Sequence, residues 1–302
     1  MSRQKIKKQA KHGKHRRCLP KNKTLPKSNM DNEVQSTSHT ASINCYLESE
    51  YADVRLSDSH LIWNLNSPLL LPENQMAQVA VTNFNIPNSM YIIDENNNLL
   101  SFTFGGVTYN LTLSTGNYNA NELDTEITTQ ATASFPVGSV LTVTYSGTTN
   151  KYTFKIQTGG VDINWQINGT TTCFKEIGVN PSTTYSYNGT QILPNQVDLG
   201  GVSNIFLKCL NLSVNNRTTE GTISNTLAKI PCDVPSLNYI YMSQQEPIYF
   251  DITNRLIRQI DIKLENQRFQ SLIIGGVQWG LTLTFRFTKL EGKRTIDDEI
   301  HN

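Results

Sequence analysis

Histidine is the first residue to examine for catalysis or metal binding, because its pKa and its two ring nitrogens suit both tasks. The chain has five histidines, of which His12, His15 and His39 lie in the first 44 residues and His301 lies one residue before the last. Only His60 belongs to the central part of the chain. A metal centre, a Ser-His-Asp triad or a Cys-His pair needs histidine held in place by folded structure. We therefore interpret His60 as a surface residue beside a strand, and we expect the protein not to be an enzyme.

Two segments near the end of the chain contain residues that can bind phosphate or metal ions in other contexts. The sequence EGKRT at 291–295 resembles part of a phosphate-binding loop, but Phe287 stands where the GxxxxGK[ST] pattern requires Gly. Asp297, Asp298 and Glu299 are consecutive acids that we expect to be hydrated. Neither segment predicts a cofactor or a metal ion.

The five cysteines are odd in number and far apart in the sequence, without a CxxC pair, and they are Cys18, Cys45, Cys173, Cys209 and Cys232. This pattern argues against a zinc site and against a disulfide framework, so we expect reduced thiols. No secretory signal peptide and no apolar run of about 18 residues is present, which predicts synthesis in the cytoplasm or nucleus and no membrane span.

The N-terminal part of the chain is strongly basic. Of the 26 Lys and Arg residues, 11 lie in residues 1–30, which contain no Asp or Glu, so residues 31–302 carry 15 basic and 25 acidic residues. A charged segment with so few large apolar residues cannot offset the entropy of ordering, and we expect a flexible arm. The residues that we expect to neutralise nucleic-acid phosphates are Lys5, Lys7, Lys8, Lys11, Lys14, Arg16 and Arg17. A nuclear localisation signal and a solubilising tail are the two alternatives for this arm.

The remainder of the chain alternates apolar with polar residues in the manner of half-buried strands. Leu100, Phe102 and Phe104 precede Gly105-Gly106, and a second alternating run follows, which predicts a hairpin with a primed turn. A second hairpin is expected to pair Leu141, Val143 and Tyr145 with Tyr152, Phe154 and Ile156. The clearest strands are expected near the end, at 257–267, where Ile260, Ile262 and Leu264 alternate with polar residues, and from Val277 to Phe287.

One segment, GNYNANELDTEITTQ at 116–130, has a helical pattern instead. Asn119 and Glu122 have the spacing of a capping box, and Tyr118 can pack on Leu123. Leu123, Ile127 and Ala131 form one apolar stripe. The pattern predicts a short helix whose stripe packs on a sheet as a lid.

These elements predict an all-β fold, a jelly-roll sandwich with extra hairpins and one short helix, preceded by the flexible basic arm. The expected organisation is an arm and linker over 1–44, a body over 45–290 in which 92–190 is a possible insertion, and a tail over 291–302.

Four motifs in this order are similar to those of the penton (vertex capsid) proteins of virophages and Polinton-like viruses, of the mavirus type. They are GNY at 116–118, FKEIG at 174–178, LAKIP at 227–231, and IRQIDIKLENQ followed by LIIGGVQWGLTLTFRF at 257–287. The resemblance covers roughly 45–288 and excludes the arm.

This resemblance implies a structural capsid protein that forms a homopentamer at the fivefold vertices of an icosahedral virion. Its partners would be other copies of itself and a double jelly-roll major capsid protein. The charge of the basic arm, which the resemblance does not cover, suits either a position facing packaged double-stranded DNA or one threaded under neighbouring subunits. The family implies no catalytic residues and no cofactors. Two other interpretations remain open: another minor capsid or cement protein, and a jelly-roll attachment module that binds a receptor or glycan. For the attachment module, the tyrosines that could stack on sugars are Tyr185, Tyr187, Tyr239, Tyr241 and Tyr249.

Overall fold

The computed structural model describes residues 39–71, 75–212, 216–217 and 223–289. The predicted nucleic-acid-binding residues of the arm, Cys18 and the acids of the tail lie outside the described residues.

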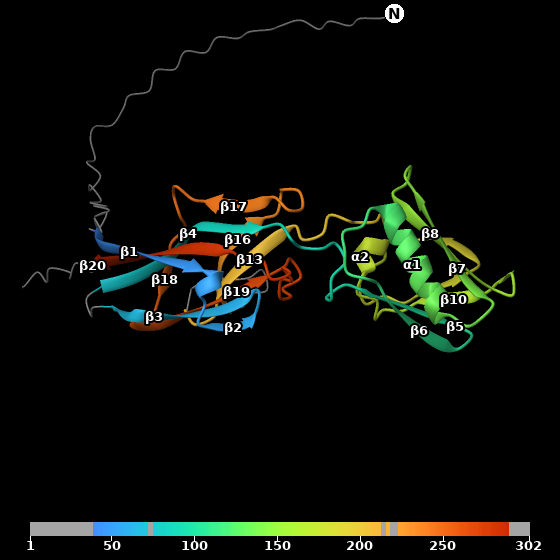
Figure 1. The fold of residues 1–302 in the computed structure, drawn as a ribbon, viewed down its shortest axis with the longest axis horizontal. Helices are drawn as coiled ribbons and strands as arrows, with labels where there is room; N and C mark the ends of the chain where they lie inside the picture. The colour runs from blue at the N-terminus through green and yellow to red at the C-terminus, as the bar shows by residue number, and fades with distance from the viewer. Residues whose placement is uncertain (1–38, 72–74, 213–215, 218–222, 290–302) are drawn as a thin grey trace, which may run out of the picture. The chain divides into compact units, whose positions relative to one another are not determined.

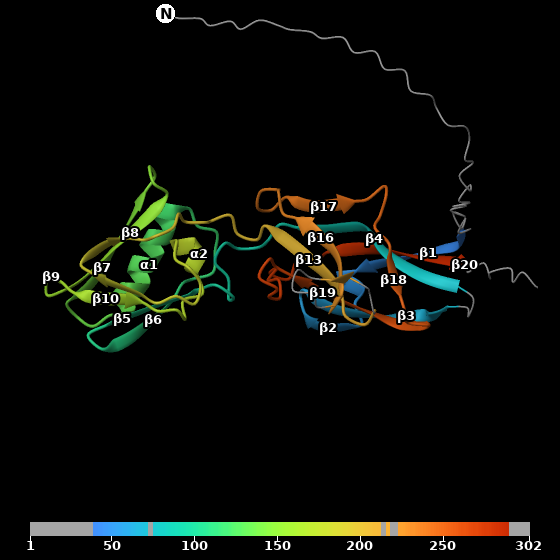
Figure 2. The same ribbon diagram turned by 180° about the vertical axis from the view of Figure 1, so that it is seen from behind.

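Most of the described chain outside 88–203 forms two sheets of five strands each (Figures 1 and 2). The first contains β1 (His39–Glu48), β20 (Gly280–Lys289), β4 (Gln75–Pro87) and β17 (Tyr239–Ser243) in the order β1-β20-β4-β17, and β18 (Phe250–Ile252) also pairs with β4. The second contains β16 (Thr226–Pro231), β13 (Asn204–Cys209), β19 (Leu256–Glu265), β3 (His60–Leu70) and β2 (Val54–Ser57) in the order β16-β13-β19-β3-β2. Short elements connect or extend these strands, namely the 3-10 turn η1 (Ser49–Tyr51) and the ribbon β14 (Asn216–Arg217) with β15 (Ile223–Ser224).

The order of these strands defines the fold. Followed along the chain, the strands alternate between the two sheets: β1 lies in the first sheet, β3 in the second and β4 in the first. The next two strands, β13 and β16, are neighbours in the second sheet. The chain then places β17 in the first sheet, β19 in the second and β20 in the first. All of these pairs are antiparallel. Two Greek keys wound in this way are a jelly roll. The predicted all-β, jelly-roll class is therefore confirmed from the strand order of the chain itself.

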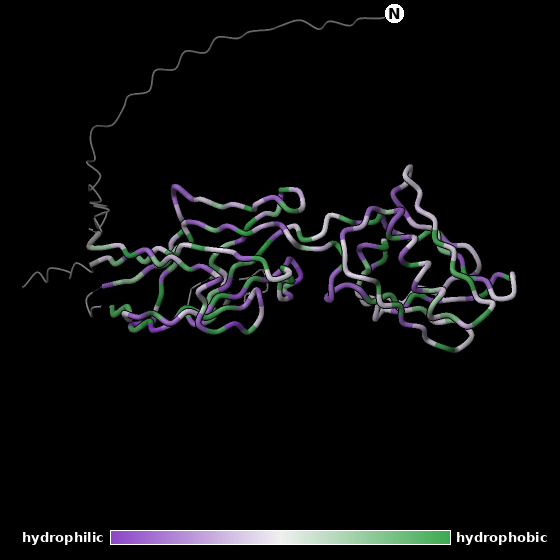
Figure 3. The backbone as a smooth tube through the Cα atoms, viewed as in Figure 1, coloured by the Kyte–Doolittle hydropathy of each residue, from purple (hydrophilic) through white to green (hydrophobic). Residues whose placement is uncertain are grey.

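The jelly-roll core follows from the period-2 pattern of its strands. In β20, the alternate residues Leu281, Leu283, Phe285 and Phe287 are buried, and Thr282 and Arg286 on the other face are partly exposed. Ile260, Ile262 and Leu264 of β19 are fully buried in the facing sheet. Figure 3 shows hydrophobic (green) and hydrophilic (purple) residues interspersed along the chain. The expected strand from Val277 begins three residues later, at Gly280.

Residues 88–203, between β4 and β13, form two further sheets and the two helices. One sheet has the order β11-β10-β5-β6, and the other has the order β12-β8-β7 with β9 paired to β8. Their bounds are β5 (Leu99–Phe104), β6 (Val107–Thr112), β7 (Ser139–Ser146), β8 (Lys151–Thr158), β9 (Val161–Asp162), β10 (Asn164–Ile167), β11 (Tyr185–Asn188) and β12 (Thr190–Ile192), with α1 (Ala120–Ser134) and α2 (Phe174–Ile177). We call 88–203 the inserted segment; apart from Met90, which packs in the jelly-roll core, its buried hydrophobic side chains form a cluster separate from that of the jelly roll. The domain boundaries expected from the sequence stay a prediction.

Both predicted hairpins are present with the expected pairs. Leu100 lies opposite Leu111, and Gly105 and Gly106 have φ angles of 57° and 78°, as a type I′ turn requires. In the second hairpin, Leu141 lies opposite Ile156 and Tyr145 opposite Tyr152.

The predicted helix is also confirmed. The Asn119 side chain accepts hydrogen bonds from the backbone N–H groups of Asn121 and Glu122, and the Glu122 carboxylate accepts from Asn119 N–H at 2.9 Å, which completes the capping box. Leu123, Ile127 and Ala131 are buried. The stripe packs against β7 and β6, inside the inserted segment, so the helix covers sheets of that segment rather than the jelly roll.

Some elements differ from the expectation. β1 begins at His39, within the predicted linker, because β20 is long enough to pair with it as far as Thr288. Val161 is 66% exposed and lies in the short strand β9, which Ile163 separates from β10. A second helix, α2, occupies one turn at FKEI and ends at Gly178, whose φ of 83° is left-handed.

Replacing the cap residue tests the local origin of α1. Asn119→Ala removes two hydrogen bonds to the first turn and should lower the free energy of unfolding by about 1 kcal/mol. Hydrogen exchange of the α1 amides should accelerate, as measured by mass spectrometry. Asn121→Ala, two residues further along and exposed, is the control; an equal effect of both substitutions would contradict the capping role.

Candidate functional site

His60 has a specific partner in the structure. Its Nε2 lies 2.9 Å from Oδ1 of Asp261, on the neighbouring strand β19, and both side chains are about one-fifth exposed. A triad would also need a nucleophile bound to the ring. The hydroxyls of the neighbouring Ser57 and Ser59 form a hydrogen bond with each other, 3.3 Å apart, and neither is paired with the His60 ring. We therefore interpret the His60–Asp261 pair as a cross-link between β3 and β19.

The described thiols have the environment of structural cysteines. Cys173 and Cys209 are buried, Cys45 and Cys232 are partly exposed, and all four are free. Burial raises the pKa of the Cys209 and Cys232 thiols to about 12, so they are protonated at neutral pH and weakly reactive. Within the described ranges, no group of three or more His, Cys, Asp or Glu side chains could hold a metal ion.

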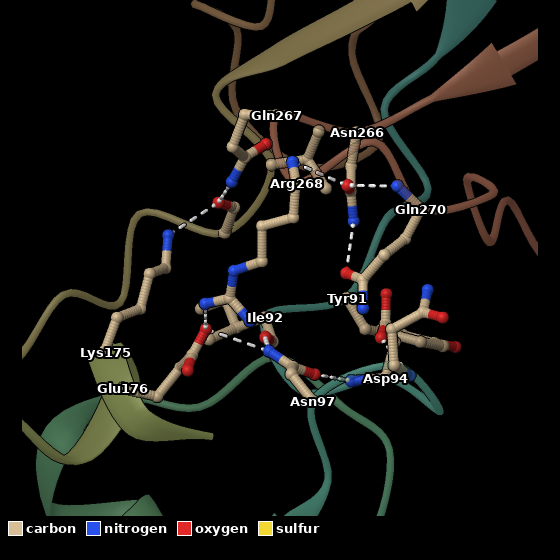
Figure 4. A pocket seen from close by; sticks show the side chains of 13 residues that line it. Tyr91, Ile92, Asp94, Asn97, Lys175, Glu176, Asn266, Gln267, Arg268 and Gln270 are labelled. Carbon is tan, nitrogen blue, oxygen red and sulfur yellow. Dashed lines mark hydrogen bonds and ion pairs between the residues drawn. The ribbon is translucent and has the colours of Figure 1, made fainter. Parts of the chain in front are cut away.

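Among the ion pairs of the described residues, the most deeply buried joins the inserted segment to the loop after β19. Nη2 of Arg268 lies 3.2 Å from Oε1 of Glu176, whose side chain is only 1% exposed, and Asn97 Nδ2 donates to the same oxygen at 2.9 Å. Figure 4 shows Arg268 pointing from its loop toward Glu176 and Asn97. The second oxygen of Glu176, Oε2, is buried without a hydrogen-bond partner in the described structure. We call Glu176, Arg268 and Asn97 the buried ionic cluster.

Burial and the charge of Arg268 act on the Glu176 carboxyl in opposite directions. Burial raises the pKa of the Glu176 carboxyl, and the charge of Arg268 lowers it by less. The guanidinium of Arg268 also lies 4.4 Å from the centre of the Phe174 ring. Glu176 and Arg268 are 92 residues apart, and no local pattern in the sequence announces their contact.

The hollow beside this cluster is too small for a ligand. It measures about 20 Å³, which is room for roughly one water molecule. Its wall includes Lys175, which pairs with Asp198 at 3.1 Å and donates to Gly201 O. We therefore interpret the buried ionic cluster as a structural contact between the inserted segment and the loop after β19.

Two sets of exposed apolar side chains on the jelly roll are better candidates for a functional surface. The first set, which we call the β17 edge, lies on and beside the edge strand β17 and contains Leu237, Tyr239, Tyr241 and Ile248, each at least 62% exposed. The second, which we call the β1–β2 edge, lies along β1, η1 and β2 and contains Tyr46, Tyr51, Val54 and Leu56, each at least 42% exposed. Trp63 Nε1 of β3 donates a hydrogen bond to Glu48 O at the end of β1. This bond links the first sheet to the second beside the β1–β2 edge.

The five tyrosines singled out in the sequence divide between different places. Tyr239 and Tyr241 are exposed on β17, and Tyr249 lies under the guanidinium of Arg286, which is 3.7 Å from its ring centre. Tyr185 and Tyr187 are partly buried in the inserted segment and stack on each other. The structure therefore does not bring the five together into one site.

Within the described residues, no helix is long and apolar enough to cross a membrane.

Comparisons with known proteins give weak structural likenesses. No family model matches the sequence, and no curated protein matches it. The crystal structure of the mavirus penton protein matches with a TM-score of 0.40 and 10% identity, covering 82% of this chain and 99% of that one. The cryo-EM structure of the Sputnik virophage matches with a TM-score of 0.38 and 13% identity (82% and 98%), and VP17, a capsid protein of bacteriophage P23-77, with 0.18 and 8% (83% and 99%).

Removing the cation from the buried ionic cluster should lower the free energy of unfolding, and the size of this loss should depend on pH. Arg268→Gln leaves Glu176 buried without a counter-charge, so stability at pH 7 should fall by about 3–5 kcal/mol in urea denaturation. The folded pKa of Glu176 is raised, so its stabilising contribution is complete below the unfolded pKa and is lost as the pH rises through the folded pKa. The variant should raise that pKa further, and its deficit should shrink toward pH 4.

Two further variants make this expectation specific. Glu176→Gln combined with Arg268→Gln removes both charges and should recover most of the stability at pH 7. Arg55→Gln breaks an exposed pair with Asp58 and should cost less than about 1 kcal/mol. Equal losses for Arg55→Gln and Arg268→Gln would contradict the role of burial.

Proposed function

We propose that this chain is a structural capsid protein that assembles as a homopentamer at the fivefold vertices of an icosahedral virion. The observation that carries the proposal is the pair of exposed apolar edges on the jelly-roll body. Several exposed large apolar side chains grouped along one edge of a domain are typical of a surface that binds a partner. The motifs at 116–118, 174–178, 227–231 and 257–287 support the same assignment.

The positions of the two edges suit a ring. β1 and β17 are at opposite ends of the order β1-β20-β4-β17. A closed ring needs heterologous contacts, in which one surface of each subunit meets a different surface of the next. The β17 edge of one subunit would pack on the β1–β2 edge of its neighbour, and repetition of this contact would close the ring.

The other partners follow from the shell and from the charge of the chain. A vertex subunit would contact a double jelly-roll major capsid protein around it. The basic arm, through Lys5, Lys7, Lys8, Lys11, Lys14, Arg16 and Arg17, would face packaged double-stranded DNA. A minor capsid or cement protein would share these features away from the vertex, and the position of its density in a virion reconstruction distinguishes the two.

The ring is tested by native mass spectrometry of the purified full chain. We expect a five-subunit species at micromolar concentration, and the double substitution Tyr239→Ser, Tyr241→Ser should weaken assembly at least tenfold, because exposed tyrosines are frequent hot spots of interfaces. The matched control replaces two exposed apolar residues of the inserted segment, Val137→Ser and Val161→Ser, and should assemble normally. A stable monomer at every concentration would refute the proposal.

The arm is tested separately. The full chain should bind double-stranded DNA of any sequence, with an affinity that falls steeply as salt increases, and deletion of residues 1–30 should abolish this binding. Fluorescence anisotropy with two unrelated duplexes measures both properties. Equal binding by the truncated chain would show that the arm is not responsible.

A further inference from the structure

A strained and exposed aromatic residue lies in the loop that follows β19. Phe269 has a φ angle of 58° and is 55% exposed. A left-handed backbone is unfavourable for a bulky side chain, so the loop must hold this conformation. Asn266 O accepts from Phe269 N–H at 3.0 Å, and Asn266 Oδ1 accepts from the backbone N–H groups of Arg268 and Gln270. Strain of this kind concentrates at functional surfaces, which makes the surroundings of Phe269 a candidate.

Another aromatic ring and three lysines surround Phe269. The centre of the Phe206 ring, on β13, lies 5.2 Å from that of Phe269. Lys208 Nζ lies 5.2 Å from the centre of the Phe269 ring, and Lys229 Nζ lies 5.9 Å from the centre of the Phe206 ring. Phe206 lies opposite Lys229 of β16, and Lys208 lies opposite Lys263 of β19, so these side chains share one face of the second sheet. We call Phe206, Lys208, Lys229, Lys263 and Phe269 the Phe269 patch.

The charge of the patch is opposite to that of the body. Lys208 and Lys263 both pair with the carboxylate of Glu265, whereas Lys229 is exposed and has no ion pair among the described contacts. Three lysines against one carboxylate leave a local excess of positive charge, although residues 31–302 carry 15 basic and 25 acidic residues. The patch therefore attracts a negatively charged partner.

An acidic segment with aliphatic side chains suits both parts of the patch. Aromatic side chains surrounded by a charged rim are the usual anchors of protein interfaces. In this chain, residues 296–300, Ile-Asp-Asp-Glu-Ile, contain the only run of three consecutive acids, and an isoleucine flanks the run on each side. A nucleic acid suits the patch less well, because the ammonium groups of Lys208 and Lys229 already lie over the faces of Phe269 and Phe206 on which bases would stack.

The reach of the chain favours a second copy as the source of this segment. β20 ends at Lys289, opposite Gln75, which lines the same hollow as Arg255, the residue before β19. The patch lies at the other end of the ten-residue strand β19, about 34 Å away along the strand. Residues 297–299 reach at most about 27–36 Å from Lys289 when the chain is fully extended. Since the path must also pass from the first sheet to the outer face of the second, these acids fall short of the patch of their own chain.

We propose that the Phe269 patch binds residues 296–300 of a second copy of this chain. Ile296 and Ile300 pack on the rings of Phe206 and Phe269, and the three acids between them pair with the lysines of the patch. This inference rests on the proposed function, because assembly brings the copies next to one another. It adds a contact between copies that is separate from the β17 edge and the β1–β2 edge.

Carbodiimide cross-linking of the full chain tests this contact, because the reagent joins a lysine amine to a carboxylate only when the two are in contact. Unlabelled and 15N-labelled chains are mixed in equal amounts before assembly, and the cross-linked peptides are identified by mass spectrometry. We expect links from residues 297–299 to Lys208, Lys229 or Lys263, with mixed-label peptides as frequent as same-label ones. The link between Lys263 and Glu265, whose charged atoms lie 2.9 Å apart in one chain, is the internal control and should never carry mixed labels.

Two variants and a control make this test specific. Phe269→Gly removes the ring and suits the left-handed backbone, so the chain should fold, and the mixed-label links should fall at least about fivefold. Ile296→Ser with Ile300→Ser keeps the three acids and should have the same effect. Val107→Ser removes an apolar side chain that is 50% exposed on β6, outside the patch, and should leave the links unchanged.

The outcomes separate this inference from the proposed function. A five-subunit species without mixed-label links would overturn the inference and leave the proposed function standing, whereas a monomer at every concentration without such links would refute both. Mixed-label links in an assembly of another size would support the inference and refute the pentamer. Links within single chains only, or mixed-label links that Phe269→Gly leaves unchanged, would also overturn the inference. Single-stranded DNA that binds the chain after deletion of residues 1–30, and that Phe269→Gly releases, would assign the patch to nucleic acid instead.

Discussion

The pairing of β20 with both β1 and β4 is the interaction on which the jelly roll depends. β20 lies between these two strands, and all ten of its residues have a partner on β4. Its inward side chains, such as Leu283 and Phe285, are completely buried. β1 begins at His39 and β20 at Gly280, so the sheet joins parts of the chain that are far apart in sequence. The entropy of closing such long loops must be offset before the contacts form, and we expect slow folding that requires the last strand.

This topology explains why a long insertion is tolerated between β4 and β13. The insertion enlarges a loop that the jelly roll must close in any case, and the entropy of closure grows only with the logarithm of loop length. Apart from Met90, the inserted segment buries its own apolar residues in a separate cluster, so it places little demand on the jelly-roll core. The buried ionic cluster adds a directional contact to this arrangement, because Glu176 belongs to α2 and Arg268 follows β19.

Elements with local causes could be predicted from the sequence, and elements with distant causes could not. The Gly105-Gly106 turn, the Asn119 capping box and the alternation in β19 and β20 depend on neighbouring residues, and all are present. The start of β1 depends on the length of β20, and the short strands β11 and β12 depend on partners in β10 and β8. These strands lie in a stretch rich in Gly, Pro and Asn that has little strand pattern of its own. The buried ionic cluster combines residues from separate elements, so no spacing in the sequence announces it.

The distribution of charge and of exposed apolar groups separates the roles of the chain's parts. Residues 31–302 carry an excess of acidic over basic residues, so the body as a whole repels a polyanion while the arm attracts it. The β17 edge and the β1–β2 edge are mainly apolar and suit contact between protein surfaces. Because these surfaces use different physical interactions, one can be altered by substitution with little effect on the others, and each role can be tested in the same full-length chain.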